Sequence, residues 1–259
     1  MPDTQNAAQH VKPFVYDSLS AKALHFSISE LQSRMLLKDP YALDVEYTRT
    51  MMGFLLFKPE PQNIAMIGLG GGSLAKFCFR YLKQSRIQVV EINPHVIALR
   101  DEFHVPPDDD RFTVVRGDGA QYVRYCASRC DVLMVDGFDS QGPPSRLCSQ
   151  RFYDDCYDSL QSGGVMVVNL HYGHANYDIQ IERIRRSFNG AVLVVDDGEQ
   201  SNSIVFSCKG STFDRYRPGA VRRPKNLEDA AANQLLAAFA LIMSALKDQA
   251  GFNPNAHPL

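Results

Sequence analysis

The sequence predicts an α/β protein with a mostly parallel sheet of seven strands, preceded by a smaller β-rich piece. Between about residues 63 and 208, short apolar runs that are typical of strands alternate with helical segments. These runs are almost continuously apolar, as expected for parallel strands that are covered on both faces. Four glycines, Gly68, Gly70, Gly71 and Gly72, follow the first of these strands and open a helix.

The composition is that of an ordinary soluble protein. Of the 259 residues, 45% are hydrophobic and 22% are charged, and the net charge of -2 gives no general attraction to nucleic acid or to an anionic membrane. The six cysteines form no CxxC pair and no zinc-site spacing with histidine, so we expect no metal site and reduced thiols in the cytoplasm. No secretory leader is evident, and the longest apolar run, Leu235 to Leu246, is too short to span a bilayer.

The first fifty residues are expected to form a separate small unit. Short β-prone pieces between Phe14 and Leu37 are broken by Asp, Ser and Glu, which predicts a small sheet. A helix is expected to begin at Asp39-Pro40 and to connect this sheet to the rest of the chain. We therefore divide the sequence into a β-rich domain with its connecting helix at 1–50, a main domain at 51–210, and a linker with a C-terminal helix at 211–259.

The strands of the main domain follow one another in a regular order. The expected strands are NIAMIGL, IQVVEIN, RFTVVRGD, DVLMVDGF, GVMVVNL, AVLVVDD and SIVFSC. Ser73 and Pro94 fit the first turns of the helices that follow the first two strands. The last expected helix, from about Leu227 to Lys247, is apolar nearly all round in its second half, so we expect it to be buried against the body or a second subunit.

The glycine cluster and two acidic residues indicate a bound nucleoside. Glycine lets a strand turn tightly into a helix and lets a ligand approach the backbone. The loop contains Gly68, Gly70 and Gly72, and Glu91 ends the second strand, where a carboxylate accepts hydrogen bonds from both ribose hydroxyls. Asp118, after the third strand, could accept from the exocyclic amine of adenine. The alternative is that the glycines only make a turn and the acids only end strands.

A dinucleotide is the main competing ligand. The GxGxxG pattern of dinucleotide sites would place its third glycine at position 73, where the chain has Ser73. That pattern also requires no acid after the third strand. The GxGxG spacing of Gly68, Gly70 and Gly72 fits a pocket of the S-adenosylmethionine type, so we favour a nucleoside with a sulfonium tail.

Two further acids follow the fourth strand. Asp136 and Asp139 are placed at the carboxyl edge of the sheet, where ligands bind in open α/β sheets. Beside a sulfonium centre, a carboxylate can hold a cationic acceptor and take its proton as the nitrogen attacks. The alternative is that Asp136 only ends the strand and Asp139 only caps the loop. The Gly142-Pro143 pair that follows favours a functional loop.

Taken in order, these segments resemble the spermidine synthase (polyamine aminopropyltransferase) family. The resemblance runs from about Leu24 to Leu170 and includes the glycine-rich loop, VVEINPHVI, DDRFTVVRGDGAQYV and DVLMVDGFDSQGP. It implies a small N-terminal β-hairpin domain on a Rossmann-like, seven-stranded transferase domain, and a subunit that forms homodimers or tetramers. It also implies a decarboxylated S-adenosylmethionine donor and a small amine acceptor.

The resemblance assigns roles by position. The residues that would bind the donor are Gln32, Gly68, Gly70, Gly72, Glu91, Asp118 and Gly119. Gln32 and Glu91 would face the ribose region, and Asp118 would meet the adenine. Asp136 and Asp139 would face the reacting amine, with Asp139 as the base.

The chain departs from the family at positions that select the substrates. Matched from Leu74, the aspartate of the family's GGGDG loop, which holds the aminopropyl ammonium of the donor, falls on Gly70. The residues at 48–50 read TRT where the family has YHE, Tyr47 is displaced by one position, and Ser140 replaces a proline.

The glycine at position 70 leaves the donor open. A carboxylate there would repel the α-carboxylate of intact S-adenosylmethionine by several kcal/mol at ~4 Å in a shielded pocket, whereas a loop lined by amides can accept an anion. The transferred group is therefore aminopropyl, as in the family, or methyl from the intact donor. The sequence is also compatible with a nucleoside-binding protein without catalysis and with an NAD-dependent oxidoreductase. Arg49 is a candidate to hold a carboxylate, because its planar fork suits one.

Overall fold

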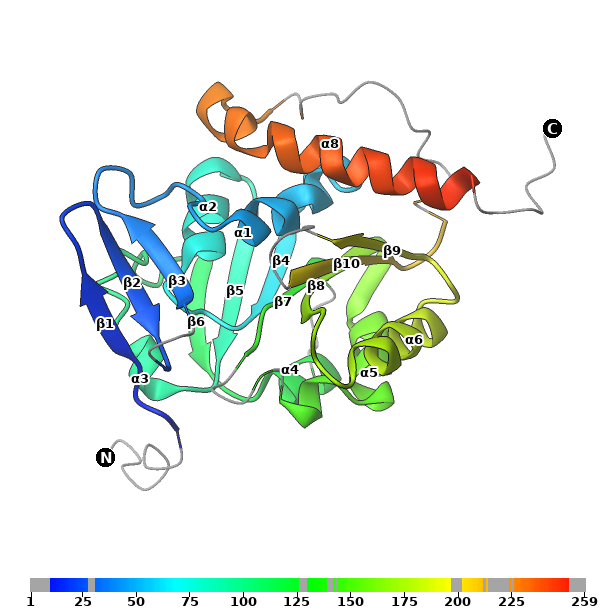
Figure 1. The fold of residues 1–259 in the computed structure, drawn as a ribbon, viewed down its shortest axis with the longest axis horizontal. Coiled ribbons are helices and arrows are strands. Elements are labelled where there is room, and N and C mark those ends of the chain that lie inside the picture. The colour runs from blue at the N-terminus through cyan, green and yellow to red at the C-terminus, as the bar shows by residue number, and fades with distance from the viewer. Residues whose placement is uncertain are drawn as a thin grey trace.

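The structure, a computed structural model, describes residues 10–27, 31–125, 130–138, 142, 144–196, 202–211, 213, 224 and 226–251. Two sheets and the helices that cover them make up this part of the chain (Figure 1). The smaller sheet is antiparallel and contains β1 (Phe14–Asp17), β2 (Ala21–His25) and β3 (Leu31–Leu36). The predicted small N-terminal sheet is therefore confirmed.

The larger sheet has seven strands in the order β6-β5-β4-β7-β8-β10-β9. These strands are β4 (Asn63–Ile67), β5 (Arg86–Glu91), β6 (Phe112–Arg116), β7 (Cys130–Val135), β8 (Leu160–His171), β9 (Val192–Asp196) and β10 (Asn202–Cys208). Among the strands that the structure describes in this sheet, β10 runs opposite to the other six, which confirms the predicted mostly parallel α/β fold. The strand order reverses between β4 and β7, and ligands bind at the carboxyl ends of strands that flank such a switch point.

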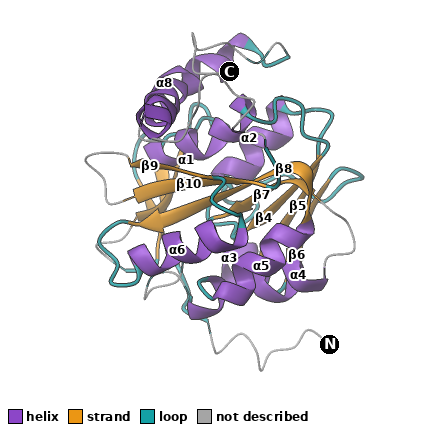
Figure 2. Ribbon diagram, turned by 90° about the vertical axis from the view of Figure 1, so that its right-hand side faces the viewer, coloured by secondary structure: helices purple, strands orange, loops and turns teal. Residues whose placement is uncertain are grey.

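Helices cover both faces of this sheet. They are α1 (Glu46–Met51), α2 (Ser73–Tyr81), α3 (Pro94–Ile97), α4 (Gly119–Tyr125), α5 (Gln150–Ser159), α6 (Tyr177–Ser187) and α8 (Asp229–Gly251), with the short 3-10 helices η2 (Met52–Leu56) and η3 (Ser145–Leu147). Figure 2 shows the sheet between two helical layers, with α4, α5 and α6 on one face and α1, α2 and α8 on the other. Coverage on both faces explains why the strands read as continuous apolar runs.

The connecting helix begins later than the sequence predicts. The expected start is Asp39-Pro40, but α1 begins at Glu46. The segment before α1 is held by tertiary contacts, because the N–H of Leu43 donates to Oε1 of Gln234 in α8 at 2.9 Å. The carbonyl of Leu43 accepts from Nε of Arg49 at 2.7 Å. These contacts compete with the local helix signal and prevail over it, as tertiary contacts often do.

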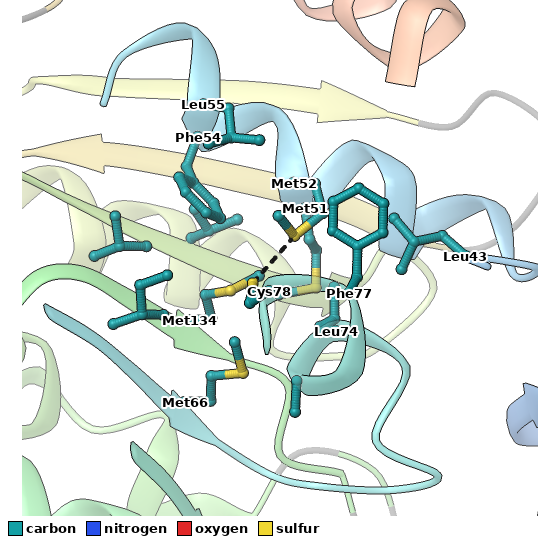
Figure 3. Packing of buried hydrophobic residues seen from close by; sticks show 14 of the residues in the cluster. Leu43, Met51, Met52, Phe54, Leu55, Met66, Leu74, Phe77, Cys78 and Met134 are labelled. Carbon is teal, nitrogen blue, oxygen red and sulfur yellow. Dashed lines mark hydrogen bonds between the residues drawn. The ribbon is translucent and has the colours of Figure 1, made fainter. Parts of the chain in front are cut away.

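A methionine-rich core fills the space between the sheet and the helical segment α1–η2 (Figure 3). Met51 and Met52 from that segment pack with Met66 and Met134 from the strands. The Sγ of Cys78, on α2, lies 3.8 Å from the Sδ of Met52. Burial raises the pKa of the Cys78 thiol, so this cysteine stays protonated and serves packing.

Helix α8 lies across α1, η2 and β9 (Figure 1). Its buried residues are Ala231, Ala232, Leu235, Ala238, Phe239, Ile242, Met243 and Leu246. Leu236 and Leu241 on the same helix are exposed. Residues 229–249 have the length and mean hydropathy of a membrane span, contrary to the expectation from the shorter apolar run. The helix nevertheless packs one full face on the body, as a core helix of a soluble protein does.

Candidate functional site

The glycine-rich loop joins β4 to α2 at the switch point of the sheet. Gly68, Gly70 and Gly72 have positive φ angles of 97°, 53° and 72°, a region that glycine adopts without steric cost. A Cβ on Gly68 would overlap the carbonyl oxygen of Asp136, so glycine there lets the ends of β4 and β7 approach each other. A Cβ on Gly70 would meet only the Cβ of Ser33, at 3.8 Å, so the space beside Gly70 is open.

Glu91 holds this loop from the end of β5. Its buried carboxylate accepts hydrogen bonds from the backbone N–H groups of Leu69 and Asn93, each at 2.8 Å. Burial raises the pKa of Glu91, and these N–H donors oppose the rise. The backbone N–H groups of Ile92 and Gly70 also act on this carboxylate, so the hydroxyls of a ribose placed against the loop would share its oxygens with four donors of the protein.

Asp118 lies at the end of β6, with both carboxylate oxygens already engaged. One oxygen accepts from the N–H of Ala120 at 2.9 Å, and the other forms an ion pair with Arg146. Gly119 opens α4 next to it, and a Cβ on Gly119 would overlap the side chain of Ile67 on β4. The glycine at 119 therefore serves the close packing of α4 on the sheet.

Asp136 lies at the end of β7, where two side chains from other elements bind it. Its Oδ2 accepts from the hydroxyl of Tyr47 in α1 at 3.0 Å, and its Oδ1 accepts from Nδ2 of Asn169 in β8 at 2.9 Å. Burial raises the pKa of Asp136, while these two hydrogen bonds lower it. Burial and then the neighbouring carboxylate raise the pKa of Tyr47, so its hydroxyl remains a hydrogen-bond donor.

The other predicted site residues are placed differently. Asp139 lies outside the described residues, so its role as base stays a prediction. Gln32 is half-buried in β3. The register between β2 and β3 shifts at this point, because Leu24 pairs with Ser33 and the next residue, His25, pairs with Leu31. A bulge of this kind changes the direction of a side chain. Its neighbour Ser33 is buried, and the Oγ of Ser33 lies 3.3 Å from the Oγ of Ser73 at the start of α2.

Three residues at the site carried no role in the sequence prediction: Ser33, Tyr47 and Asn169. The signal for Asn169 was its position, since it is the one polar residue in the run VMVVNL, which lies in the buried part of β8. The only signal for Tyr47 was its displacement by one position from a family motif. Its hydrogen bond to Asp136 could not be predicted, because the two residues are 89 positions apart. Arg49 donates to the carbonyls of Leu43 and Asp44, so its guanidinium is engaged in holding the chain before α1.

The arrangement suits a polar, cationic or nucleoside-like ligand. Two buried or partly buried carboxylates, Glu91 and Asp136, flank the glycine-rich loop at the same edge of the sheet. One can bind hydroxyls, and the other can hold an amine and accept its proton. Among the residues that the structure describes, no group of three His, Cys, Asp or Glu side chains is arranged to hold a metal ion.

Comparison with known proteins identifies relatives of this chain. A family profile described as spermine/spermidine synthase domain matches residues 45–187. A polyamine aminopropyltransferase of Chromobacterium violaceum is 39% identical over 191 residues, covering 73% of this chain and 73% of the relative. A polyamine aminopropyltransferase of Neisseria meningitidis is 36% identical over 211 residues, covering 81% of this chain and 80% of the relative.

Solved structures share the fold. A probable spermidine synthase from Corynebacterium glutamicum superposes with a TM-score of 0.67 at 21% identity, covering 76% of this chain and 77% of the other. Human methyltransferase-like protein 13, in complex with SAH, superposes with a TM-score of 0.59 at 22% identity, covering 78% of this chain and 93% of the other. At these identities the likeness concerns the fold alone.

Proposed function

Because the chain belongs to the spermine/spermidine synthase family, we propose that it is a transferase that moves an aminopropyl group from decarboxylated S-adenosylmethionine to a small amine. The observation that carries this proposal is the cluster of Tyr47, Asp136 and Asn169 beside the glycine-rich loop. It places a carboxylate in a shielded position next to the loop at which the donor would bind. The curated relatives named polyamine aminopropyltransferase support the same reaction.

In this proposal the residues divide between donor and acceptor. The donor would lie along Gln32, Gly68, Gly70, Gly72, Glu91, Asp118 and Gly119. Glu91 would accept from the ribose hydroxyls. Asp118 would meet the adenine with the acceptor capacity left after its bonds to Ala120 and Arg146. Asp136 and Asp139 would hold the acceptor amine, and Asp139 would take its proton.

The transfer needs alignment more than activation. The amine nitrogen attacks the carbon bound to the sulfonium, the N–C bond forms, and the C–S bond breaks with its electron pair going to sulfur. The products are a neutral thioether and the alkylated amine, whose extra proton goes to a carboxylate. Holding the nitrogen and the carbon in line supplies most of the rate, and the base adds to it by removing the proton.

The direct test is an assay of the purified protein with decarboxylated and intact S-adenosylmethionine and a panel of small amines. We expect an aminopropylated amine and a thioether product from the decarboxylated donor. Methylated product from the intact donor would replace this proposal with a methyltransferase, which the open space at Gly70 makes the second candidate. Tight binding of the thioether without any transfer would indicate a nucleoside-binding protein that lacks catalysis.

The pH dependence of this transfer follows from the environment of Asp136. Burial raises its pKa, so at low pH the carboxyl is protonated and can no longer bind an ammonium or accept a proton. We expect kcat/KM to fall as the pH drops through this raised pKa, above the range of an ordinary aspartate. A profile that stays flat from pH 7 down to the ordinary range of about 4 would contradict an active role for this carboxylate.

Replacing Gly70 with aspartate tests donor selection. The space beside Gly70 is open, and aspartate tolerates a positive φ better than most residues, so the side chain fits. We expect Gly70→Asp to weaken binding of intact S-adenosylmethionine by about tenfold or more, through repulsion of its carboxylate, and to preserve or strengthen binding of the decarboxylated form. Calorimetric titration with each donor measures both effects.

The control for this substitution is Gly70→Asn, which has the same shape without the charge. It should reduce the affinity for both donors equally, if at all. If Gly70→Asp and Gly70→Asn change the two affinities in the same ratio, the loop does not discriminate donors by charge.

The proposal extends to assembly and location. We propose a cytoplasmic homodimer, without nucleic acid or membrane as partner. The family resemblance supports the dimer, and the exposed Leu236 and Leu241 on α8 offer apolar surface for it. The cysteines that the structure describes are all buried. Sedimentation of the purified protein tests the oligomeric state.

A further inference from the structure

Lys76 is a buried lysine in the first turn of α2, directly after the glycine-rich loop. Only 1% of the residue is exposed. Its backbone N–H donates to the carbonyl of Gly72 at 2.8 Å, and its Nζ donates to the carbonyl of Phe103, also at 2.8 Å. Lys76 therefore joins the loop to a second segment, which precedes β6 in the chain.

The ammonium of Lys76 has little compensation for its burial. An ammonium has three N–H donors, and the carbonyl of Phe103 is its one acceptor in the part of the chain that the structure describes. Burial lowers the pKa of Lys76 to about 8, with no carboxylate opposing the change. Burying a charge with so few partners costs stability, so the retention of this lysine indicates a role other than packing.

The protonation of Lys76 depends on its burial and not on a charged neighbour. The charged groups on the surrounding elements are Arg34 on β3, Arg80 on α2, Glu91 on β5, and Asp101, Glu102 and His104 before β6. Glu102 forms an ion pair with Lys22 at 2.8 Å. None of these groups is a cause of the lowered pKa of Lys76, which follows from desolvation alone.

Residues 103–105 form a turn that supports the glycine-rich loop from behind. A Cβ on Gly71 would lie 2.9 Å from Cδ1 of Phe103, and a Cβ on Gly72 would lie 2.4 Å from Cγ2 of Val105. Between these two contacts, His104 has a positive φ of 55°. The loop backbone therefore rests directly on this turn, and a shift of the turn would move the loop.

We propose that Lys76 is a positioning residue for the donor, because its ammonium holds the 103–105 turn against the glycine-rich loop and so keeps the loop in its binding shape. This inference rests on the proposed function, in which the loop binds the donor. A hydrogen bond from a charged donor is about twice as strong as one between neutral groups. The grip of Lys76 on the carbonyl of Phe103 therefore depends on its proton.

The test measures binding of 5′-methylthioadenosine, the thioether that remains after aminopropyl transfer, by calorimetric titration. This probe has neither an aliphatic amine nor a carboxyl group, so its charge stays constant between about pH 7 and 9.5. Lys76→Met should weaken its binding by about tenfold at neutral pH. In steady-state kinetics the same variant should raise KM for the donor and leave KM for the amine unchanged.

The pH dependence of binding separates positioning from a merely structural role. The affinity of the wild type should fall by about fivefold as the pH rises through about 8, because the neutral amine is the weaker donor. The affinity of Lys76→Met should be low and independent of pH. In Lys76→Arg the charge persists over this range, so the loss at high pH should disappear. A wild-type affinity that is constant over this range would overturn the inference.

Urea unfolding checks that the lysine is buried and that the variant folds. The pKa of Lys76 is lower in the folded chain than its ordinary value of 10.5, so the folded chain loses this proton first as the pH rises. This group should therefore raise the stability of the wild type between about pH 8 and 10.5, and Lys76→Met should lack that gain. Equal pH dependence in the two proteins would contradict the buried ammonium.

The matched control is Lys209→Met. Nζ of Lys209 also donates to a backbone carbonyl at 2.8 Å, that of Tyr157 in α5, on the other face of the sheet. Its loss should leave binding of the probe unchanged. If the wild type binds the probe and Lys76→Met binds it equally well, this inference is wrong and the proposed function stands. If the wild type does not bind the probe, the donor site of the proposed function fails first.

Discussion

Replacing Asp136 with asparagine is expected to lower kcat by about 10²-fold, the size of loss that follows when a reacting group is no longer held in line. The substitution keeps the size of the side chain but removes the negative charge that would hold the acceptor amine. It also places an amide where Tyr47 and Asn169 now donate to a carboxylate. Steady-state kinetics with the decarboxylated donor, at saturating amine, measure the loss.

Asp131 provides the control, because it lies on the same strand. Its carboxylate accepts from the N–H groups of Gln62 and Asn63 and pairs with Lys58, far from the carboxyl edge. Asp131→Asn should lower thermal stability with little change in kcat. If Asp136→Asn retains full kcat while Asp139→Asn does not, Asp136 is a structural strand end, as the second interpretation of the sequence holds.

The second large effect is expected on stability, from Gly68→Ala. Gly68 has a φ of 97°, and a Cβ there would overlap the carbonyl oxygen of Asp136. Neither the backbone of β7 nor the loop can move without breaking sheet hydrogen bonds, such as that from the N–H of Asp136 to the carbonyl of Ile67 at 2.9 Å. Backbone strain and overpacking together should cost about 3 kcal/mol or more. Urea unfolding monitored by circular dichroism gives this free energy.

Gly190→Ala separates the two causes. Gly190 has a φ of 79°, similar to that of Gly68, but a Cβ there would have no atom within 4 Å. Its cost should be only the backbone strain, about 1–2 kcal/mol. Equal destabilisation by the two variants would show that the approach of β4 to β7 at Gly68 tolerates a methyl group.

The fold could be predicted from the sequence because its signals are local. Each strand of the large sheet is an apolar run bounded by polar or glycine residues, and Pro94 begins α3 after the cap residue Asn93. The start of α1 could not be predicted in the same way. The signal at Asp39-Pro40 is a sound local start, but the contact of Leu43 with α8 spans 191 positions and decides the outcome.

The site was predictable where its residues end strands. Glu91 and Asp136 follow apolar runs, so their meeting at one sheet edge follows from parallel topology. The hydrogen-bond partners of Asp136 could not be predicted. The contacts of Tyr47 and Asn169 depend on how α1 packs on β7 and on the register of β8 with β7. The sequence also could not predict whether Asp118 is free to bind adenine, since its ion-pair partner Arg146 belongs to the segment after β7.

The position of α8 has a consequence for synthesis on the ribosome. The face of the sheet above α1, η2 and β9 is closed by residues 229–251, which are translated after every strand and after all the site residues. Gly53 approaches the side chain of Ile242 so closely that a Cβ would overlap it, so this closure is a tight fit between distant parts of the chain. A nascent chain can therefore form its sheet early while its apolar upper face stays uncovered, and chaperones have that interval in which to bind it.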